Sequence, residues 1–140
     1  MRPFKISIPQ DVLNDLTMRL KQTRWTDEPE NAGWNYGTNP TYLRELVDHW
    51  QNNYDWRTHE AYLNKFPQFK VEIDGISVHF IYIKGKSDNA KPLVLTHGWP
   101  DSFYRFHKII PMLTDPESCK DNADEAFDLV IPQYRVRFFR

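Results

Sequence analysis

The tetrapeptide His97-Gly98-Trp99-Pro100, directly after the apolar run of residues 93–96, constrains the fold of this chain more than any other feature. A buried strand that ends in a glycine-bearing turn exposes backbone N–H groups at the edge of a parallel sheet, where α/β enzymes stabilise developing negative charge. Two interpretations of the turn stay open. It is either an oxyanion hole with the backbone N–H of Trp99 as donor, or an ordinary strand-to-helix turn that needs glycine for its backbone shape.

The first half of the chain predicts helices joined by irregular segments rich in aromatic residues. Apolar side chains at helical spacing predict a first helix from Pro9 to about Arg24. Residues 25–39 show no period, and we expect them to form an extended strap whose rings pack on a neighbouring surface. Asn39, which a proline follows, starts a predicted second helix, and Asp55 caps a short third one.

In the second half the apolar residues alternate with polar ones, which predicts strands. Residues 69–73 and 76–82 flank Asp74-Gly75. Alternating apolar residues around Asp-Gly are a strong signal of a β-hairpin.

A strand, a helix and a further strand are expected after the hairpin. The continuous apolar run 93–96 predicts a strand buried on both faces, and Asp101 or Ser102 can cap a helix that reaches residue 113. Residues 127–132 predict a last buried strand, joined to the preceding one by a right-handed crossover. The order hairpin, strand, helix, strand indicates the beginning of an α/β sheet.

Composition excludes several classes of protein. The 140 residues carry a net charge of −1 and are 40% hydrophobic, which is typical of a soluble globular protein and gives no reason to expect a nucleic-acid partner. No apolar run approaches the ~20 residues that span a bilayer, so we expect a cytoplasmic protein with no membrane anchor. The single Cys119 is interpreted as a loop thiol, and no histidines show metal-ligand spacing. No metal or other cofactor is therefore expected.

A nucleophile in such a fold would sit on a Gly-x-[Ser/Asp/Cys]-x-Gly elbow between a strand and a helix. The sequence offers only Gly33 to Gly37, whose central residue is Asn35, and we assign no nucleophile. We expect His97 to orient the turn by hydrogen bonding. The other histidines lie on predicted helices or strands and are interpreted as structural or solvated: His49, His59, His79 and His107.

Many aromatic and turn residues occur in the order typical of one protein family. They are Trp25-Thr26-Asp27-Glu28-Pro29, Trp34-Asn35-Tyr36-Gly37, Tyr42-Leu43, Trp50, Tyr54-Asp55-Trp56-Arg57, Glu60, Leu63-Asn64, Phe66-Pro67-Gln68-Phe69, Ile73-Asp74-Gly75, His79-Phe80 and His97-Gly98-Trp99-Pro100-Asp101-Ser102-Phe103. In this order they closely resemble the N-terminal region of microsomal-type epoxide hydrolases, members of the α/β-hydrolase superfamily. The resemblance extends over residues 3–132.

The resemblance implies an α/β fold in two parts. A helical meander would occupy residues 1–67, and an incomplete N-terminal part of the α/β-hydrolase core would occupy residues 68–140. The N-terminal region that defines the family would cover about residues 3–110. The microsomal members carry an N-terminal membrane anchor, whereas this chain resembles their soluble relatives.

The resemblance also implies a reaction. In complete members an aspartate opens a small-molecule epoxide while two lid tyrosines polarise its oxygen, and a histidine–acid pair then activates water to release a vicinal diol. Trp99 would donate its N–H to the oxyanion of the second step, within the turn formed with His97, Gly98 and Pro100. The nucleophile, lid tyrosines, acid and base lie downstream in the family, so we expect this chain to be inactive alone.

The C-terminal residues depart from the family. After residues 127–132 the family continues with a turn like Ser-x-Pro-Gly-Tyr-Gly-Phe-Ser, whereas this chain has Gln133-Tyr134-Arg135-Val136-Arg137-Phe138-Phe139-Arg140. Codons for Arg-Val-Arg-Phe-Phe-Arg, read one base later, permit Gly-Phe-Gly-Phe-Ser. We hypothesise a frameshifted or mis-spliced tail, which a genomic sequence without such a frame would refute.

Two other functions stay open. A further strand is expected beside residues 93–96 in the complete fold, and open apolar edges recruit other chains. The chain could therefore act as a helical interaction module that docks on another hydrolase subunit or forms a homo-oligomer through the open sheet edge. Another α/β-hydrolase reaction, such as ester hydrolysis, shares the turn and would need the same missing elbow.

Overall fold

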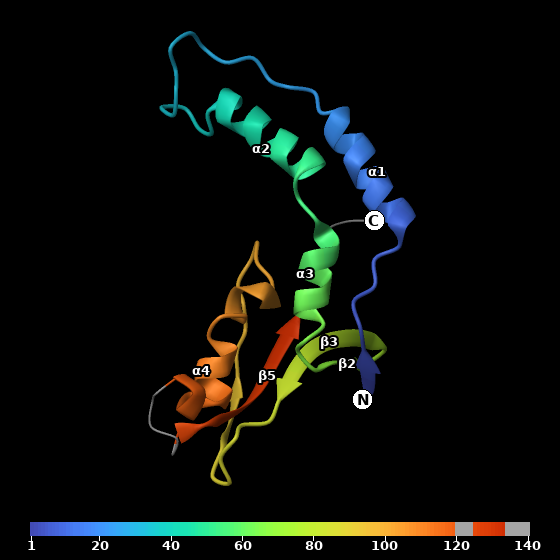
Figure 1. Ribbon diagram of the computed structural model, residues 1–140, viewed down its shortest axis with the longest axis vertical. Coiled ribbons are helices and arrows are strands. Elements are labelled where there is room, and N and C mark those ends of the chain that lie inside the picture. The colour runs from blue at the N-terminus through green and yellow to red at the C-terminus, as the bar shows by residue number, and fades with distance from the viewer. Residues whose placement is uncertain (120–124, 134–140) are drawn as a thin grey trace. The chain divides into compact units, whose positions relative to one another are not determined.

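The computed structural model describes residues 1–119 and 125–133. The chain divides into two compact units. The first, Met1–Ile6 with Glu60–Arg140, contains the β-sheet, and the second, Ser7–His59, is helical (Figure 1). Residues 134–140, on which the frameshift hypothesis rests, lie outside the described residues.

Side-chain caps begin two of the three helices of the helical unit. The helices are α1 (Gln10–Lys21), α2 (Pro40–Asn52) and α3 (Trp56–Leu63), whose first turn belongs to this unit. The Asn39 side chain accepts hydrogen bonds from the backbone N–H groups of Thr41 at 2.9 Å and Tyr42 at 3.1 Å, which begins α2. The Asp55 carboxylate accepts from the N–H of Arg57 at 2.9 Å, which begins α3. The three predicted helices and two predicted caps are confirmed.

The segment between α1 and α2 is irregular, as predicted, but its aromatic rings are more exposed than expected. The Trp25 ring lies 5.2 Å from the Arg44 guanidinium, and the Trp34 ring lies 5.3 Å from the ring of Tyr42. Trp34 is nevertheless 61% exposed and Tyr36 is 83% exposed. The prediction that these rings pack on a neighbouring surface is therefore only partly right.

The other unit is built on a five-stranded mixed sheet with the order β1-β2-β3-β5-β4. Its strands are β1 (Arg2–Phe4), β2 (Gln68–Ile73), β3 (Ile76–Ile83), β4 (Lys91–Val94) and β5 (Phe127–Gln133). β1, β2, β3 and β5 pair antiparallel in turn, and β4 pairs parallel to β5. β1 was not predicted, because three residues are too short to show an alternating pattern.

The predicted hairpin is present between β2 and β3. Asp74 has a φ of 51° and Gly75 a φ of 75°. Positive φ at both central residues is the requirement of a type I′ turn, whose twist matches that of the two strands. The resulting register runs from Ile73 opposite Ile76 to Gln68 opposite Ile81.

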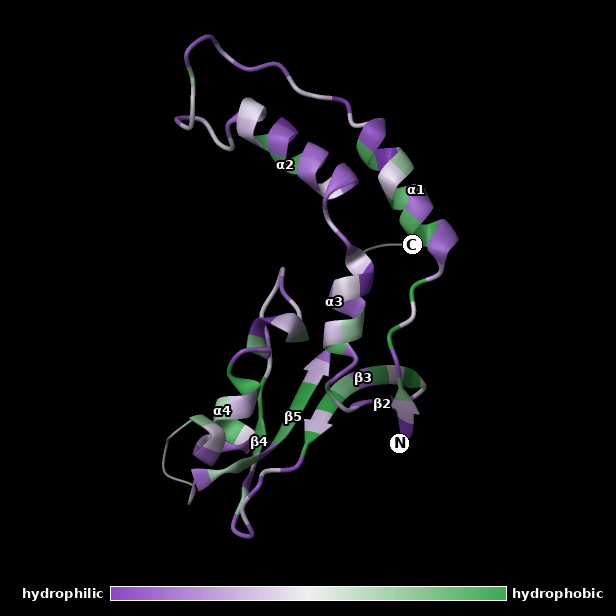
Figure 2. Ribbon diagram, in the orientation of Figure 1, coloured by the Kyte–Doolittle hydropathy of each residue, from purple (hydrophilic) through white to green (hydrophobic). Residues whose placement is uncertain are grey.

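The core of this unit lies between β3, β5 and the connection that follows β4. Ile81, Ile110, Leu129 and Ile131 are each at most 2% exposed, and Figure 2 shows β3 and β5 coloured mainly as hydrophobic. β4 is different, because it forms the edge of the sheet and Val94 is 59% exposed. The prediction that residues 93–96 are buried on both faces is therefore wrong.

The connection from β4 to β5 is a broken helix instead of the continuous one predicted. It consists of a 3-10 helix η1 (Phe103–Phe106), α4 (Ile110–Thr114) and a second 3-10 turn η2 (Pro116–Cys119). Pro111 explains the break, because proline lacks an N–H and its ring excludes the preceding helical turn. It therefore stands in the first turn of a new helix, α4.

We predict that Gly85→Ala destabilises the sheet unit. A Cβ at this position would lie 2.8 Å from the carbonyl oxygen of Phe127 and 2.9 Å from the Cβ of Ala90. Because backbone atoms of β5 cannot move aside cheaply, the free energy of unfolding in urea should fall by about 1–3 kcal/mol. Gly98→Ala is the matched control, since a Cβ there would meet nothing within 4 Å. Equal losses in the two variants would contradict the prediction.

Candidate functional site

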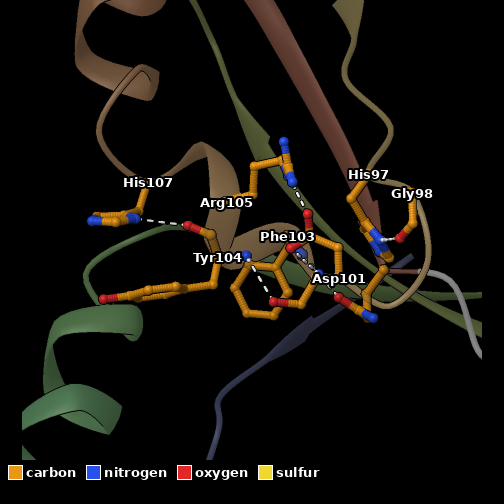
Figure 3. A network of polar contacts seen from close by, with 9 residues as sticks. His97, Gly98, Asp101, Phe103, Tyr104, Arg105 and His107 are labelled. Carbon is orange, nitrogen blue, oxygen red and sulfur yellow. Dashed lines mark hydrogen bonds and ion pairs between the residues drawn. The ribbon is translucent and has the colours of Figure 1, made fainter. Parts of the chain in front are cut away.

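The turn formed by residues 97–100 follows β4 at its carboxyl end. Because β5 runs parallel to β4, both strands end at the same edge of the sheet. His97 is only 6% exposed, and its Nδ1 lies 2.8 Å from the carbonyl oxygen of Gly98 (Figure 3). A carbonyl oxygen only accepts, so Nδ1 carries the proton and donates it. The buried imidazole thus fixes the direction of the carbonyl that precedes Trp99.

Gly98 is not required by the backbone of the turn itself. Its φ lies outside the left-handed region, and a Cβ at this position would meet nothing within 4 Å. The interpretation of an ordinary turn that needs glycine for its shape is therefore not supported. The space in front of the backbone at Gly98 is open among the described residues. Trp99 beside it is 68% exposed and joins Pro100 through a cis peptide bond.

The segment after the turn begins with three backbone donors that side-chain oxygens satisfy. The N–H of Ser102 donates to Asp101 Oδ1 at 2.8 Å, and the N–H of Tyr104 donates to Ser102 Oγ at 3.3 Å. Between them, the N–H of Phe103 donates to Oε1 of Gln133 at 3.0 Å. Asp101 and Ser102 thus both cap the segment, as the sequence suggested for either of them. The contribution of Gln133 was not foreseen.

An ion pair also lies within this segment. Asp101 forms an ion pair with Arg105 (Figure 3). The N–H of Ser102, followed by the Arg105 guanidinium, holds the pKa of the Asp101 carboxyl below its ordinary value, and the nearby His97 acts in the same direction. Asp101 is therefore an anion at neutral pH whose charge Arg105 balances.

His79 links this segment to the sheet. Its Nε2 lies 2.8 Å from Gln68 Oε1, and its ring meets the rings of Phe4 and Phe103 edge-on, at 5.1 and 5.3 Å between centroids. Burial, followed by the charge of Lys70, lowers the pKa of His79. These contacts agree with the interpretation of His79 as a structural residue.

No contact places the other residues considered in the sequence analysis at the turn of residues 97–100 within the described part of the chain. Gly33 and Gly37 lie in turns of the helical unit, without the strand and helix that a nucleophile elbow needs. His59 stacks on Tyr54 at 4.7 Å, and His107 Nδ1 donates to the carbonyl oxygen of Tyr104 at 2.7 Å. Over residues 1–119 and 125–133, no three histidine, cysteine, aspartate or glutamate side chains gather as metal ligands would. Within the same ranges, none of the helices has the length and apolar character to cross a membrane.

We predict that acid weakens the sheet unit through His79. A lowered pKa in the folded state means that the unfolded chain, with an ordinary value of 6.5, binds the proton more readily. The stabilisation is complete above pH 6.5 and is lost as the pH falls through the lower folded value. Urea unfolding should therefore give a smaller free energy at pH 5.5 than at pH 7.5. His79→Gln should reduce this difference, whereas the exposed His49→Gln should retain it; the same difference in all three proteins would contradict the role of His79.

Comparison with known proteins identifies the family. The family model described as epoxide hydrolase N terminus matches residues 1–106. Among curated proteins, the chain is 40% identical to epoxide hydrolase 1 of Sus scrofa over 94% of its own length and 30% of that protein. It is 43% identical to juvenile hormone epoxide hydrolase 2 of Ctenocephalides felis, again over 94% of its length and over 28% of that protein. The chain thus spans about 30% of the length of these relatives.

Solved structures agree with the sequence comparison. The Aspergillus niger epoxide hydrolase superposes with a TM-score of 0.82 at 30% identity, covering 96% of this chain and 35% of that one. The juvenile hormone epoxide hydrolase of Bombyx mori gives the same TM-score at 32% identity, with 96% and 36% covered. The predicted α/β-hydrolase fold class, with a sheet that is incomplete relative to the full fold, is confirmed. This chain belongs to the epoxide hydrolase family and corresponds to the N-terminal part of its α/β-hydrolase members.

Proposed function

We propose that this chain is the N-terminal part of an enzyme that hydrolyses small-molecule epoxides to vicinal diols. In this proposal the backbone N–H of Trp99 donates to the oxyanion that forms when water attacks an aspartyl ester intermediate. The observation that carries the proposal is the position of the turn at the carboxyl end of β4, beside the parallel strand β5 and with open space at Gly98. Donors held at such an edge before the reaction stabilise developing negative charge.

His97, Gly98 and Pro100 have supporting roles in this proposal. His97 fixes the carbonyl that precedes Trp99 through its 2.8 Å hydrogen bond. Gly98 leaves the approach to the donor open, and Pro100 adds no competing N–H. The proposed domain division places the helical meander at residues 1–67 and the incomplete core at 68–140, with the family's N-terminal region at about 3–110.

We also propose that this chain alone does not hydrolyse epoxides. It spans about 30% of its curated relatives, and the resemblance assigns the nucleophile, lid tyrosines, acid and base to the part it does not span. An oxyanion donor lowers the barrier of a reaction but does not start one. Purified chain incubated with styrene oxide should therefore form no more diol than buffer. Multiple turnovers would contradict this expectation.

The donor is tested in a chimera of residues 1–133 with the remaining part of juvenile hormone epoxide hydrolase 2 of Ctenocephalides felis. Trp99→Pro removes the backbone N–H, and we expect kcat to fall about 10²–10³-fold, as for the loss of one oxyanion donor. Trp99→Phe removes the indole and keeps the N–H, so it should retain kcat within about tenfold. Circular dichroism checks that both chimeras are folded. An equal loss of kcat in the two variants would exclude the N–H as the donor.

A second candidate function is an interaction module, and the edge of the sheet favours it. Within residues 1–119 and 125–133, β4 has a neighbouring strand on one side only, and Val94 is 59% exposed. Open apolar edges pair with other chains, either a second copy or another hydrolase chain. Light scattering of the purified chain should then show an oligomer that Val94→Lys reduces to a monomer. A well-folded monomer of the unmodified chain would contradict the homo-oligomer.

The cytoplasmic location stays a prediction.

A further inference from the structure

The polypeptide around the turn is attached to β5 at two points. Before the turn, the N–H of Leu95 donates to the carbonyl oxygen of Val130 at 3.0 Å. After the turn, the N–H of Phe103 donates to the side-chain oxygen of Gln133, also at 3.0 Å. Residues 96–102, which include Trp99, therefore form a loop closed by two hydrogen bonds to a single strand.

The two attachments differ in kind. The bond of Leu95 continues the parallel ladder between β4 and β5 and needs no particular side chain. The bond of Phe103 depends entirely on the side chain of Gln133. The other caps of the segment, Asp101 and Ser102, accept hydrogen bonds from Ser102, Arg105 and Tyr104, which all lie within the segment, so they shape it without attaching it to the sheet.

A second contact fixes Phe103 in the same place. Gln133 stands opposite His79 in the register of β3 and β5. The ring of Phe103 meets the His79 ring edge-on at 5.3 Å. The backbone and the ring of Phe103 are thus held by two residues that face each other across adjacent strands.

We propose that Gln133 is a positioning residue for the Trp99 donor. Its amide oxygen holds the end of the loop against β5 and so fixes where the Trp99 N–H lies, a role that rests on the proposed function. A shorter side chain such as serine ends at its γ atom, two atoms short of the Oε1 that accepts here. This hydrogen bond, the tether of the loop, therefore depends on a side chain as long as that of glutamine.

Amide hydrogen exchange of the full chain, followed by NMR, tests the tether without any need for activity. Gln133→Ala removes the acceptor, so the Phe103 amide should exchange about two- to tenfold faster, the change that one net hydrogen bond produces. The Trp99 amide, which is open to approach in this proposal, should instead change its NMR chemical shift as the loop moves. Gln133→Glu keeps an oxygen at the same reach and should restore slow exchange. Gln133→Asn is one carbon shorter and should behave like Gln133→Ala. The matched control is Gln22→Ala, an exposed glutamine of the helical unit, which should leave both amides unchanged.

Each result decides the proposal. Unchanged exchange at Phe103 in Gln133→Ala would show that the hydrogen bond is not made, and faster exchange at Phe103 with an unchanged chemical shift of the Trp99 amide would remove the positioning role. The Ile81 amide, in the middle of the sheet, reports whether each variant is folded. If Gln133→Ala loses protection there, the comparison of Gln133→Glu with Gln133→Asn gives the decision. Failure of the Trp99 chimera with the predicted exchange pattern intact would overturn the proposed function alone.

Discussion

β4 and β5 run in parallel, with Lys91 opposite Phe127 and Val94 opposite Val130. Two parallel strands end at the same edge, so the chain that leaves β4 enters its turn beside the end of β5. This geometry places residues 97–99 close to the end of β5. It also allows Gln133, at that end, to hold the segment that follows the turn. It also explains the connection through η1, α4 and η2, because parallel neighbours require a crossover. Without this pairing β4 would lose its partner in the described sheet, and the turn would not be held beside the end of β5.

Charge around the turn is arranged so that one carboxylate does not oppose the proposed reaction. An anion close to an oxyanion hole raises the energy of the negative charge that forms there. Asp101 is such an anion, but its carboxylate accepts a hydrogen bond from the N–H of Ser102 and forms an ion pair with the guanidinium of Arg105. The proposed N–H donor of Trp99 and the ion-paired carboxylate of Asp101 can therefore lie within three residues of each other.

The parts of the fold that depend on local chemistry were predictable. Asp74-Gly75 specifies its own turn, and Asn39 and Asp55 cap helices through bonds to residues two or three positions away. The break at Pro111 was visible in the sequence, yet the apolar period across it favoured one helix.

The parts that depend on distant partners were not predictable. The side chain of Gln133 reaches Phe103 across thirty positions of sequence, and β1 exists only because β2 offers it an edge. The exposure of Val94 follows from the place of β4 at the end of the sheet. The turn itself was recognised from its residues, whereas the side chains that anchor it were not.

The outward backbone N–H groups of β4 limit where a further strand can pair with this edge of the sheet. The N–H groups of Lys91 and Leu95 point towards β5, so by alternation Pro92 and Val94 face outwards. Proline brings no hydrogen to that side, and the row of outward donors begins only at Val94. An incoming strand therefore finds no outward N–H donor at the start of β4 and can accept hydrogen bonds only near its carboxyl end. Any polypeptide that pairs with this edge would therefore do so beside the turn that follows β4.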